Sequence, residues 1–224
     1  MSANVTMRAG SGFPGQPGGD GAPHGGPSPS HGARRTGLLV FMVVVSTLFG
    51  LFGVAYMMRA AYEDWRPIVY VPWQLWCSTG LLLLCSVAWE LARRHAAIGR
   101  RDAARSTSTG ALLLSATFVV SQLYAWQAMT AADYAVAANP ANSFFYLITG
   151  LHAVHVIGGM LAGAMVAAGF MRGRATQAVG EGIALCAQYW HFLFVLWLAV
   201  FGLLYFVTPE VVRAFCTTMG IPVR

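Results

Sequence analysis

The chain has 224 residues, of which 57% are hydrophobic and only 10% are charged, with a formal net charge of +6. Soluble domains carry about 25% charged residues, so this composition excludes an ordinary soluble enzyme and indicates an integral membrane protein. All 14 basic residues are arginines, in the first segment, between apolar runs or near the end, which is typical of topology signals and not of a nucleic-acid-binding surface.

Residues 1–36 have a composition of their own. They contain 9 of the 25 glycines and 5 of the 10 prolines. Such a segment buries too little apolar area to offset the entropy cost of ordering it. We therefore predict a disordered Gly/Pro-rich tail at 1–36, a transmembrane domain at 37–208 and a short C-terminal tail at 209–224.

Five apolar stretches follow the tail. They run from about Leu38 to Met58, Trp73 to Leu91, Ala111 to Ala131, Ser143 to Met171 and Ile183 to Val207. At about 1.5 Å per residue, each can cross roughly 30 Å of hydrocarbon. Backbone polar groups in lipid must be satisfied within the segment, so each stretch is predicted to be a helix. The predicted fold class is all-α, a polytopic membrane helix bundle with five transmembrane helices.

Arginine placement predicts the orientation of this bundle. With the N-terminus in the cytoplasm, 10 of the 14 arginines lie on the inner side, against 4 on the outer side. Cytoplasmic loops carry an excess of Lys and Arg, so we predict an N-in/C-out topology. The connections are predicted to be short, apart from an arginine-rich loop at Arg93–Thr109.

Polar side chains inside the apolar stretches are candidates for function, because they are costly in a bilayer. The candidates are His152, His155 and His191, with Glu90 near the end of its stretch. His152 and His155 are three residues apart and share a helix face. Helix rise places His155 and His191 at about the same depth, where they can bond to each other, to Thr149 or to a shared group.

Two interpretations of the histidines remain open. Neutral imidazoles can ligate a metal or haem. Alternatively, buried histidines link helices by hydrogen bonds, as polar residues do in membranes. No carboxylate lies nearby at mid-depth, which favours the structural interpretation.

Glu90 precedes Arg93 and Arg94 in the sequence. This spacing favours an interfacial charge paired with arginine. The alternatives are a lipid head-group contact or a surface proton collector, and the arginines would also attract anionic lipid.

Two further signals concern helix packing. The Gly159-xxx-Gly163 pattern predicts close helix approach. Asn139-Pro140 precedes the fourth stretch, where proline biases its predecessor to extended geometry and Ser143 is predicted to be the N-cap.

The last two stretches carry recognisable motifs. Tyr189–Phe192 (YWHF), with Trp197, resembles the YWHF…W signature of the final helix of haem–copper oxidase subunit III. Ser143–Phe145 (SFF) and Thr149–Gly158 (TGLHAVHVIG) resemble the phenylalanine pair and TG-x-HxxHxxG run of the preceding helix. The order and spacing also match, and a weaker resemblance extends over about residues 37–207.

The resemblance implies a short, five-helix form of this subunit in a bacterial-type plasma (inner) membrane. In that family the subunit is accessory: it packs on the catalytic subunit I, binds phospholipid, and supports proton uptake and turnover stability in cytochrome c oxidase. The resemblance therefore also implies that this chain holds no catalytic centre, metal or cofactor of its own, and that haem and copper lie in partner subunits. The expected partners are subunit I, other oxidase subunits and membrane lipids. Nucleic acid is not an expected partner.

The residues expected to couple helices or contact lipid are Tyr189, Trp190, His191, Trp197, His152, His155, Glu90, Arg93 and Arg94.

Two positions depart from the family pattern. Longer members carry a glutamate in an SE-x-MFF context where this chain has Ser46–Phe49 (STLF). Many members also carry an aspartate two residues after YWHF, where this chain has Phe194. A proton-collecting role that uses those carboxylates is therefore not expected here.

Three alternatives stay open beside the oxidase interpretation. One is the accessory subunit of a nitric oxide reductase system, which belongs to the same short family. The others, from different classes, are a free-standing haem b protein that uses the three histidines and a small transporter. A transporter normally shows broken helices or polar residues at the membrane midplane.

Overall fold

The computed structural model describes residues 29–62, 65, 66, 68, 70–173, 176–207, 211 and 218. Their regular structure is all helical: α1 (Pro29–Ala60), α2 (Trp73–Ala97), α3 (Arg101–Ala131), α4 (Pro140–Met171) and α5 (Thr176–Phe206). Within this part of the chain, five helices are long and apolar enough to cross a membrane. The prediction of an all-α bundle with five membrane-spanning segments is confirmed.

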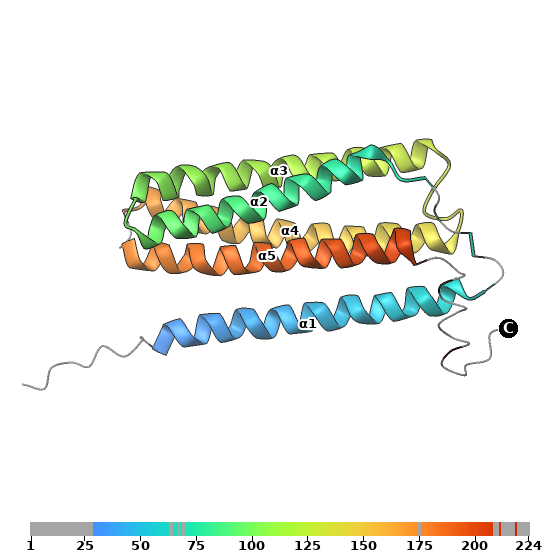
Figure 1. Ribbon diagram of the computed structural model, residues 1–224, viewed down its shortest axis with the longest axis horizontal. Coiled ribbons are helices and arrows are strands. Elements are labelled where there is room, and N and C mark those ends of the chain that lie inside the picture. The colour runs from blue at the N-terminus through green and yellow to red at the C-terminus, as the bar shows by residue number, and fades with distance from the viewer. Residues whose placement is uncertain are drawn as a thin grey trace, which may run out of the picture.

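The helices run side by side, with successive helices in opposite directions (Figure 1). Four of them form a closed bundle, in which α2 packs on α3 and α5, and α4 packs on the same two helices. Helix α1 lies outside the four-helix bundle, against α4 and α5. The bundle core is filled by fully buried aromatic side chains, among them Trp89, Phe118, Phe145, Trp190 and Trp197.

The turn between α2 and α3 is much shorter than predicted, so the expected loop at Arg93–Thr109 is wrong. Arg93 and Arg94 belong to the last turns of α2, and α3 already begins at Arg101. Gly99, at φ +76°, ends α2: its N–H bonds to the carbonyl of Ala96, and the next N–H bonds to that of His95. This is the Schellman arrangement that closes a helix at a left-handed glycine. Apolar content marks the part of a helix that can lie in hydrocarbon, whereas α2 and α3 continue beyond their apolar stretches.

Helix α1 also begins before the predicted boundary. Residues 29–36, assigned to the tail from composition, form its first turns. Arg34 and Arg35 lie there on exposed positions, and alanine and arginine favour helix even without apolar neighbours. Residues 1–28 lie outside the described residues, as does nearly all of 209–224.

Helix α4 begins at an asparagine cap and not at the serine that was predicted. Asn139 is extended (φ −158°, ψ 142°), as expected before Pro140, and its side chain accepts from the N–H of Ala141 at 3.3 Å. Ser143 lies inside the helix, where its Oγ donates to the carbonyl of Val136 at 2.7 Å. Proline has no N–H to leave unsatisfied, so Pro140 suits the first helical position and the cap is the residue directly before it, Asn139.

Candidate functional site in the helix bundle

His152 lies at the centre of the four-helix bundle and is completely buried. Its ring packs between Phe118 of α3 and Trp197 of α5, with centroid distances of 6.1 and 5.2 Å. Neither ring nitrogen has a hydrogen-bond partner within the described part of the chain. Among the described residues, His152 therefore joins three helices through ring packing, without a direct hydrogen bond to a protein group.

His155 faces α1, on the other side of α4. Its Nδ1 bonds to the carbonyl oxygen of Leu151 at 2.7 Å, within its own helix. Its ring lies 6.0 Å from that of Phe41 and 5.7 Å from that of Phe49, both on α1. The hydroxyl of Tyr189 donates to the backbone carbonyl of His155 at 3.0 Å. This residue thus marks the junction of α1, α4 and α5.

His191 contacts α2. Its Nδ1 is hydrogen-bonded to the hydroxyl of Ser86, and its Nε2 lies 3.8 Å from a carboxylate oxygen of Glu90. The side chain is 47% exposed, so it lies at the edge of the α2–α5 seam. Tyr189 and His191, two residues apart on α5, point about 200° apart and reach different neighbours.

Glu90 extends this polar contact toward the helix end. It accepts from Arg93 through both carboxylate oxygens, at 2.8 and 2.7 Å, and from Arg94 at 3.0 Å. Such bidentate charge-assisted bonds hold the carboxylate in a defined position. A continuous polar cluster thus lies where α2 meets α5, formed by Ser86, His191, Glu90, Arg93 and Arg94.

The three histidines do not form one site. His152 faces the bundle core, His155 faces α1 and His191 faces α2. No group of three or more His, Cys, Asp or Glu side chains that could hold a metal occurs within the residues the structure describes. Their arrangement does not fit a metal or haem shared by the three imidazoles.

The motif aromatics pack on the glycines of α4. A Cβ on Gly159 would lie 2.9 Å from the ring of Tyr189 and 3.4 Å from that of Trp190. One on Gly163 would lie 2.7 Å from the ring of Trp89. Bulky side chains of α2, α3 and α5 therefore fill the space over Gly159 and Gly163, whereas close approach of the helix backbones at this pattern stays a prediction.

Trp197 also makes a polar contact across the bundle. Its indole Nε1 donates to Thr79 Oγ1 of α2 at 2.9 Å. The sequence interpretation did not single out Thr79 or the buried Gln122. Both are polar residues in apolar stretches, so the rule that selected the histidines could also have selected them.

The arginine end of the bundle is the end where α1 begins, α2 turns into α3 and α4 is followed by α5. The described arginines at this end are Arg34, Arg35, Arg93, Arg94, Arg100, Arg101, Arg105 and Arg172. Arg59 and Arg66 lie at the opposite end.

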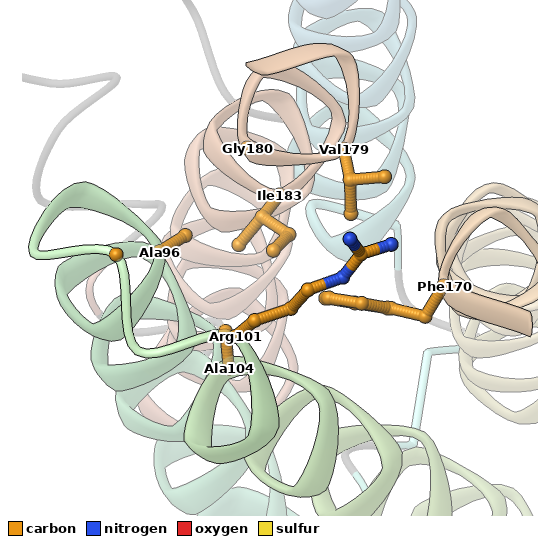
Figure 2. A pocket seen from close by; sticks show the side chains of 8 residues that line it. Ala96, Arg101, Ala104, Phe170, Val179, Gly180 and Ile183 are labelled. Carbon is orange, nitrogen blue, oxygen red and sulfur yellow. The ribbon is translucent and has the colours of Figure 1, made fainter. Parts of the chain in front are cut away.

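A small pocket opens at the arginine end, between the α2–α3 turn, the end of α4 and the start of α5. In Figure 2 the side chain of Arg101 extends across it toward Phe170 and Val179. Its volume of about 10 Å³ is room for roughly one water molecule. An organic cofactor does not fit there.

Together these features define a class: a polytopic helical membrane protein with five helices long and apolar enough to cross a membrane within the described part of the chain. Comparison with known proteins then gives the family. The family model of cytochrome c oxidase subunit III matches residues 34–208, which include all five helices except the first turns of α1. The chain belongs to the cytochrome c oxidase subunit III family.

Individual relatives agree with this assignment. Cytochrome c oxidase subunit 3 of Thermostichus vulcanus is 29% identical over 184 residues, which cover 78% of this chain and 88% of the relative. Subunit 3 from Corynebacterium diphtheriae is 28% identical over 178 residues, covering 76% and 86%. Cytochrome bo(3) ubiquinol oxidase subunit 3 of Pseudomonas aeruginosa is 24% identical over 168 residues, covering 75% and 80%.

Proposed function

We propose that this chain is the non-catalytic accessory subunit III of a haem–copper terminal oxidase, a cytochrome c oxidase of aerobic respiratory electron transport. The observation that carries the proposal is the family match over residues 34–208. The family's two motifs also meet between α4 and α5, where the Tyr189 hydroxyl donates to the carbonyl of His155 at 3.0 Å. In this proposal oxygen reduction and proton pumping take place in partner subunits, which hold the haem and copper.

The structural use of the histidines supports a non-catalytic role. His152 is enclosed by rings, His155 is bonded to its own helix, and His191 is engaged by Ser86. We infer that these residues hold the bundle in the shape that subunit I and the other oxidase subunits bind.

Lipid contact is proposed for the arginine end. Glu90 neutralises part of the charge of Arg93 and Arg94, whose side chains remain 48% and 70% exposed. Exposed arginines at a membrane surface attract anionic phospholipid head groups. The charge excess at this end also supports placing it, with the N-terminus, on the cytoplasmic side of a bacterial-type inner membrane.

Support for proton uptake is proposed to be indirect. Ser46 and Thr47, at the position of the family's glutamate, donate to carbonyls of their own helix at 2.8 and 2.9 Å. Phe194 likewise offers no carboxylate. We therefore expect any effect on proton uptake to come from how the subunit arranges the complex and its lipids.

The test is purification of the tagged full-length chain from its native membrane in mild detergent, followed by a subunit gel, an absorption spectrum and turnover assays. We expect a large haem- and copper-containing subunit to co-purify, with oxygen consumption driven by reduced cytochrome c. Turnover with a quinol alone would change the electron donor and keep the oxidase assignment.

Other outcomes would overturn the proposal. Reduction of nitric oxide but not oxygen by the purified assembly would place the chain in a nitric oxide reductase system. A chain that purifies alone with its own haem band would be a free-standing haem protein.

A further inference from the structure

Among the buried polar side chains of the four-helix bundle that lack protein partners, Gln122 and His152 are the two described residues in which both side-chain polar atoms are unpartnered. Gln122 of α3 is 2% exposed and His152 of α4 is 0% exposed. Within the described residues, neither the amide oxygen and nitrogen of Gln122 nor the ring nitrogens of His152 have a hydrogen-bond partner. Buried polar groups in proteins are nearly always hydrogen-bonded, to protein or to ordered water, so these two residues need an explanation.

The two side chains lie on facing stripes of α3 and α4. Phe118, Gln122 and Trp126 are spaced four residues apart and therefore share one face of α3. Phe118 contacts the ring of His152, and the indole of Trp126 donates to Thr149 Oγ1 at 3.2 Å. Gln122 lies between these two contacts and so faces the same stretch of α4.

Helix rise also places Gln122 and His152 at nearly the same level along the bundle. Gln122 is nine residues from the end of α3 at Ala131, and Thr149 is nine residues from the start of α4 at Pro140. These two ends lie at the same end of the bundle (Figure 1). His152 is one turn further along α4, on the same face as Thr149. Gln122 therefore lies within about one helix turn of His152 across the α3–α4 contact.

The other polar groups near Gln122 and His152 already have hydrogen-bond partners. Thr149 donates to the carbonyl of Phe145 at 2.6 Å and accepts from Trp126. Trp197, which packs on His152, donates to Thr79 at 2.9 Å. Thr149, Trp126 and Trp197 are therefore not available as further partners, and Gln122 and His152 still need them.

A direct bond between the two side chains would not satisfy them. It would pair one amide atom with one ring nitrogen and leave the other amide atom and the other nitrogen unpartnered. Water can donate and accept at once, and buried waters typically make about three bonds to such groups.

We propose that the core of α2–α5 binds ordered water at the level of Gln122 and His152, and that this water bridges the two side chains. The site makes the bundle interior locally hydrated within the depth of the membrane, enclosed by Phe118, Thr149 and Trp197. This inference is independent of the oxidase assignment.

The deciding experiment is an electron cryo-microscopy structure of the full-length chain in its native complex, at a resolution that shows ordered water. We expect density within hydrogen-bond distance of both Gln122 and His152. A core without water density, or a direct Gln122–His152 contact with no water beside it, would overturn the proposal.

A set of variants tests whether the two residues act as one unit. Gln122→Met and His152→Phe keep the shape of each side chain and remove its polar atoms. Each single variant leaves the other polar group without its bridge, so we expect each to lower the melting temperature by several degrees. The double variant lets the core become dry, so its loss should be clearly smaller than the sum of the two.

Ser115→Ala is the matched control, because Ser115 is buried on α3 and donates to the carbonyls of Ala111 and Leu112 of its own helix, and not to His152. When Ser115→Ala is combined with His152→Phe, the decreases in melting temperature should add. Additive losses for the Gln122 and His152 pair as well would contradict a shared water site.

Discussion

At the scale of single residues, Gly163 is the described glycine with the least room for an added side chain. A Cβ at this position would lie 2.7 Å from Trp89 Cζ2 and 2.9 Å from Leu112 Cδ2. Trp89 is completely buried, so its ring has little room to move. Glycine is therefore needed here for space, to let α4 approach α2 and α3.

The first prediction concerns this contact. Gly163→Ala should destabilise the protein by about 1–3 kcal/mol, because the added methyl group overpacks a filled core. The measurement is thermal unfolding of the purified complex, followed through loss of its solubility in detergent. Gly158→Ala is the control, since a Cβ at Gly158 meets no atom within 4 Å, and it should melt like the parent.

A second residue-scale prediction concerns His155, the contact of α4 with Phe41 and Phe49 of α1. His155→Leu should weaken the docking of α1 and lower retention of the chain in its complex, because the ring contacts are lost. The absorption spectrum of the complex that is retained should not change, since His155 is proposed to hold no haem. Subunit gels and spectra of the same preparation measure both.

His155→Phe is the matched variant for this test. It keeps the ring and should restore retention. If His155 were a haem ligand, both variants would alter the spectrum of an intact complex, and the structural role would be wrong.

At the scale of elements, helix ends are set by short-range chemistry that hydropathy does not detect. Asn139 caps α4, and its Nδ2 donates to the backbone carbonyl of Arg66, in the connection between α1 and α2. The backbone N–H of Arg66 returns a bond to Asn139 Oδ1 at 3.5 Å. One side chain thus starts a helix and also ties down a segment far away in the sequence.

The third prediction separates these two roles. Asn139→Ala should lower the free energy of unfolding by about 1 kcal/mol because the cap is lost. It should lower it further because the bonds to Arg66 are lost as well. Asn139→Asp keeps the capping oxygen and removes the Nδ2 donor, so it should lose only the second part. Melting temperature reports stability, and cleavage by a protease added from the α1–α2 side reports the connection. Equal losses in both variants would show that the cap contributes nothing.

At the scale of the whole molecule, most of the described arginines lie at one end of the bundle. Because successive helices are antiparallel, this end collects residues from the starts of α1 and α3 and from the ends of α2 and α4 (Figure 1). The opposite end carries the α1–α2 and α3–α4 connections. A charge difference of this kind sets the orientation of a membrane protein during insertion.

The fourth prediction is the orientation itself. Single cysteines at Ile98 and Ala132, in a chain whose own cysteines are replaced by serine, place a label site in the two opposite connections; Ile98 is exposed and has an ordinary negative φ. In intact cells, a membrane-impermeant maleimide should label the Ala132→Cys variant and reach the Ile98→Cys variant only after permeabilisation. The reverse pattern would show that the N-terminus lies outside.

The sequence by itself determined the class, the five helices and the family. These follow from apolar runs long enough to cross a bilayer and from motifs whose residues lie close together along the chain, and both are local properties. Helix boundaries were less accessible. The ends of α2 and α3 at the Gly99 turn and the Asn139 cap of α4 depend on backbone hydrogen bonds beyond the apolar runs.

Only the tertiary structure decided which polar residues meet. His155 and His191 were placed at a similar depth, yet one faces Phe49 of α1 and the other Ser86 of α2. Depth follows from residue number and helix rise, whereas the direction of a side chain depends on how each helix is rotated against its neighbours. In helices that are apolar on nearly every side, hydropathy carries little information about that rotation, and packing of Trp89, Trp190 and Trp197 against α4 and its neighbours sets it.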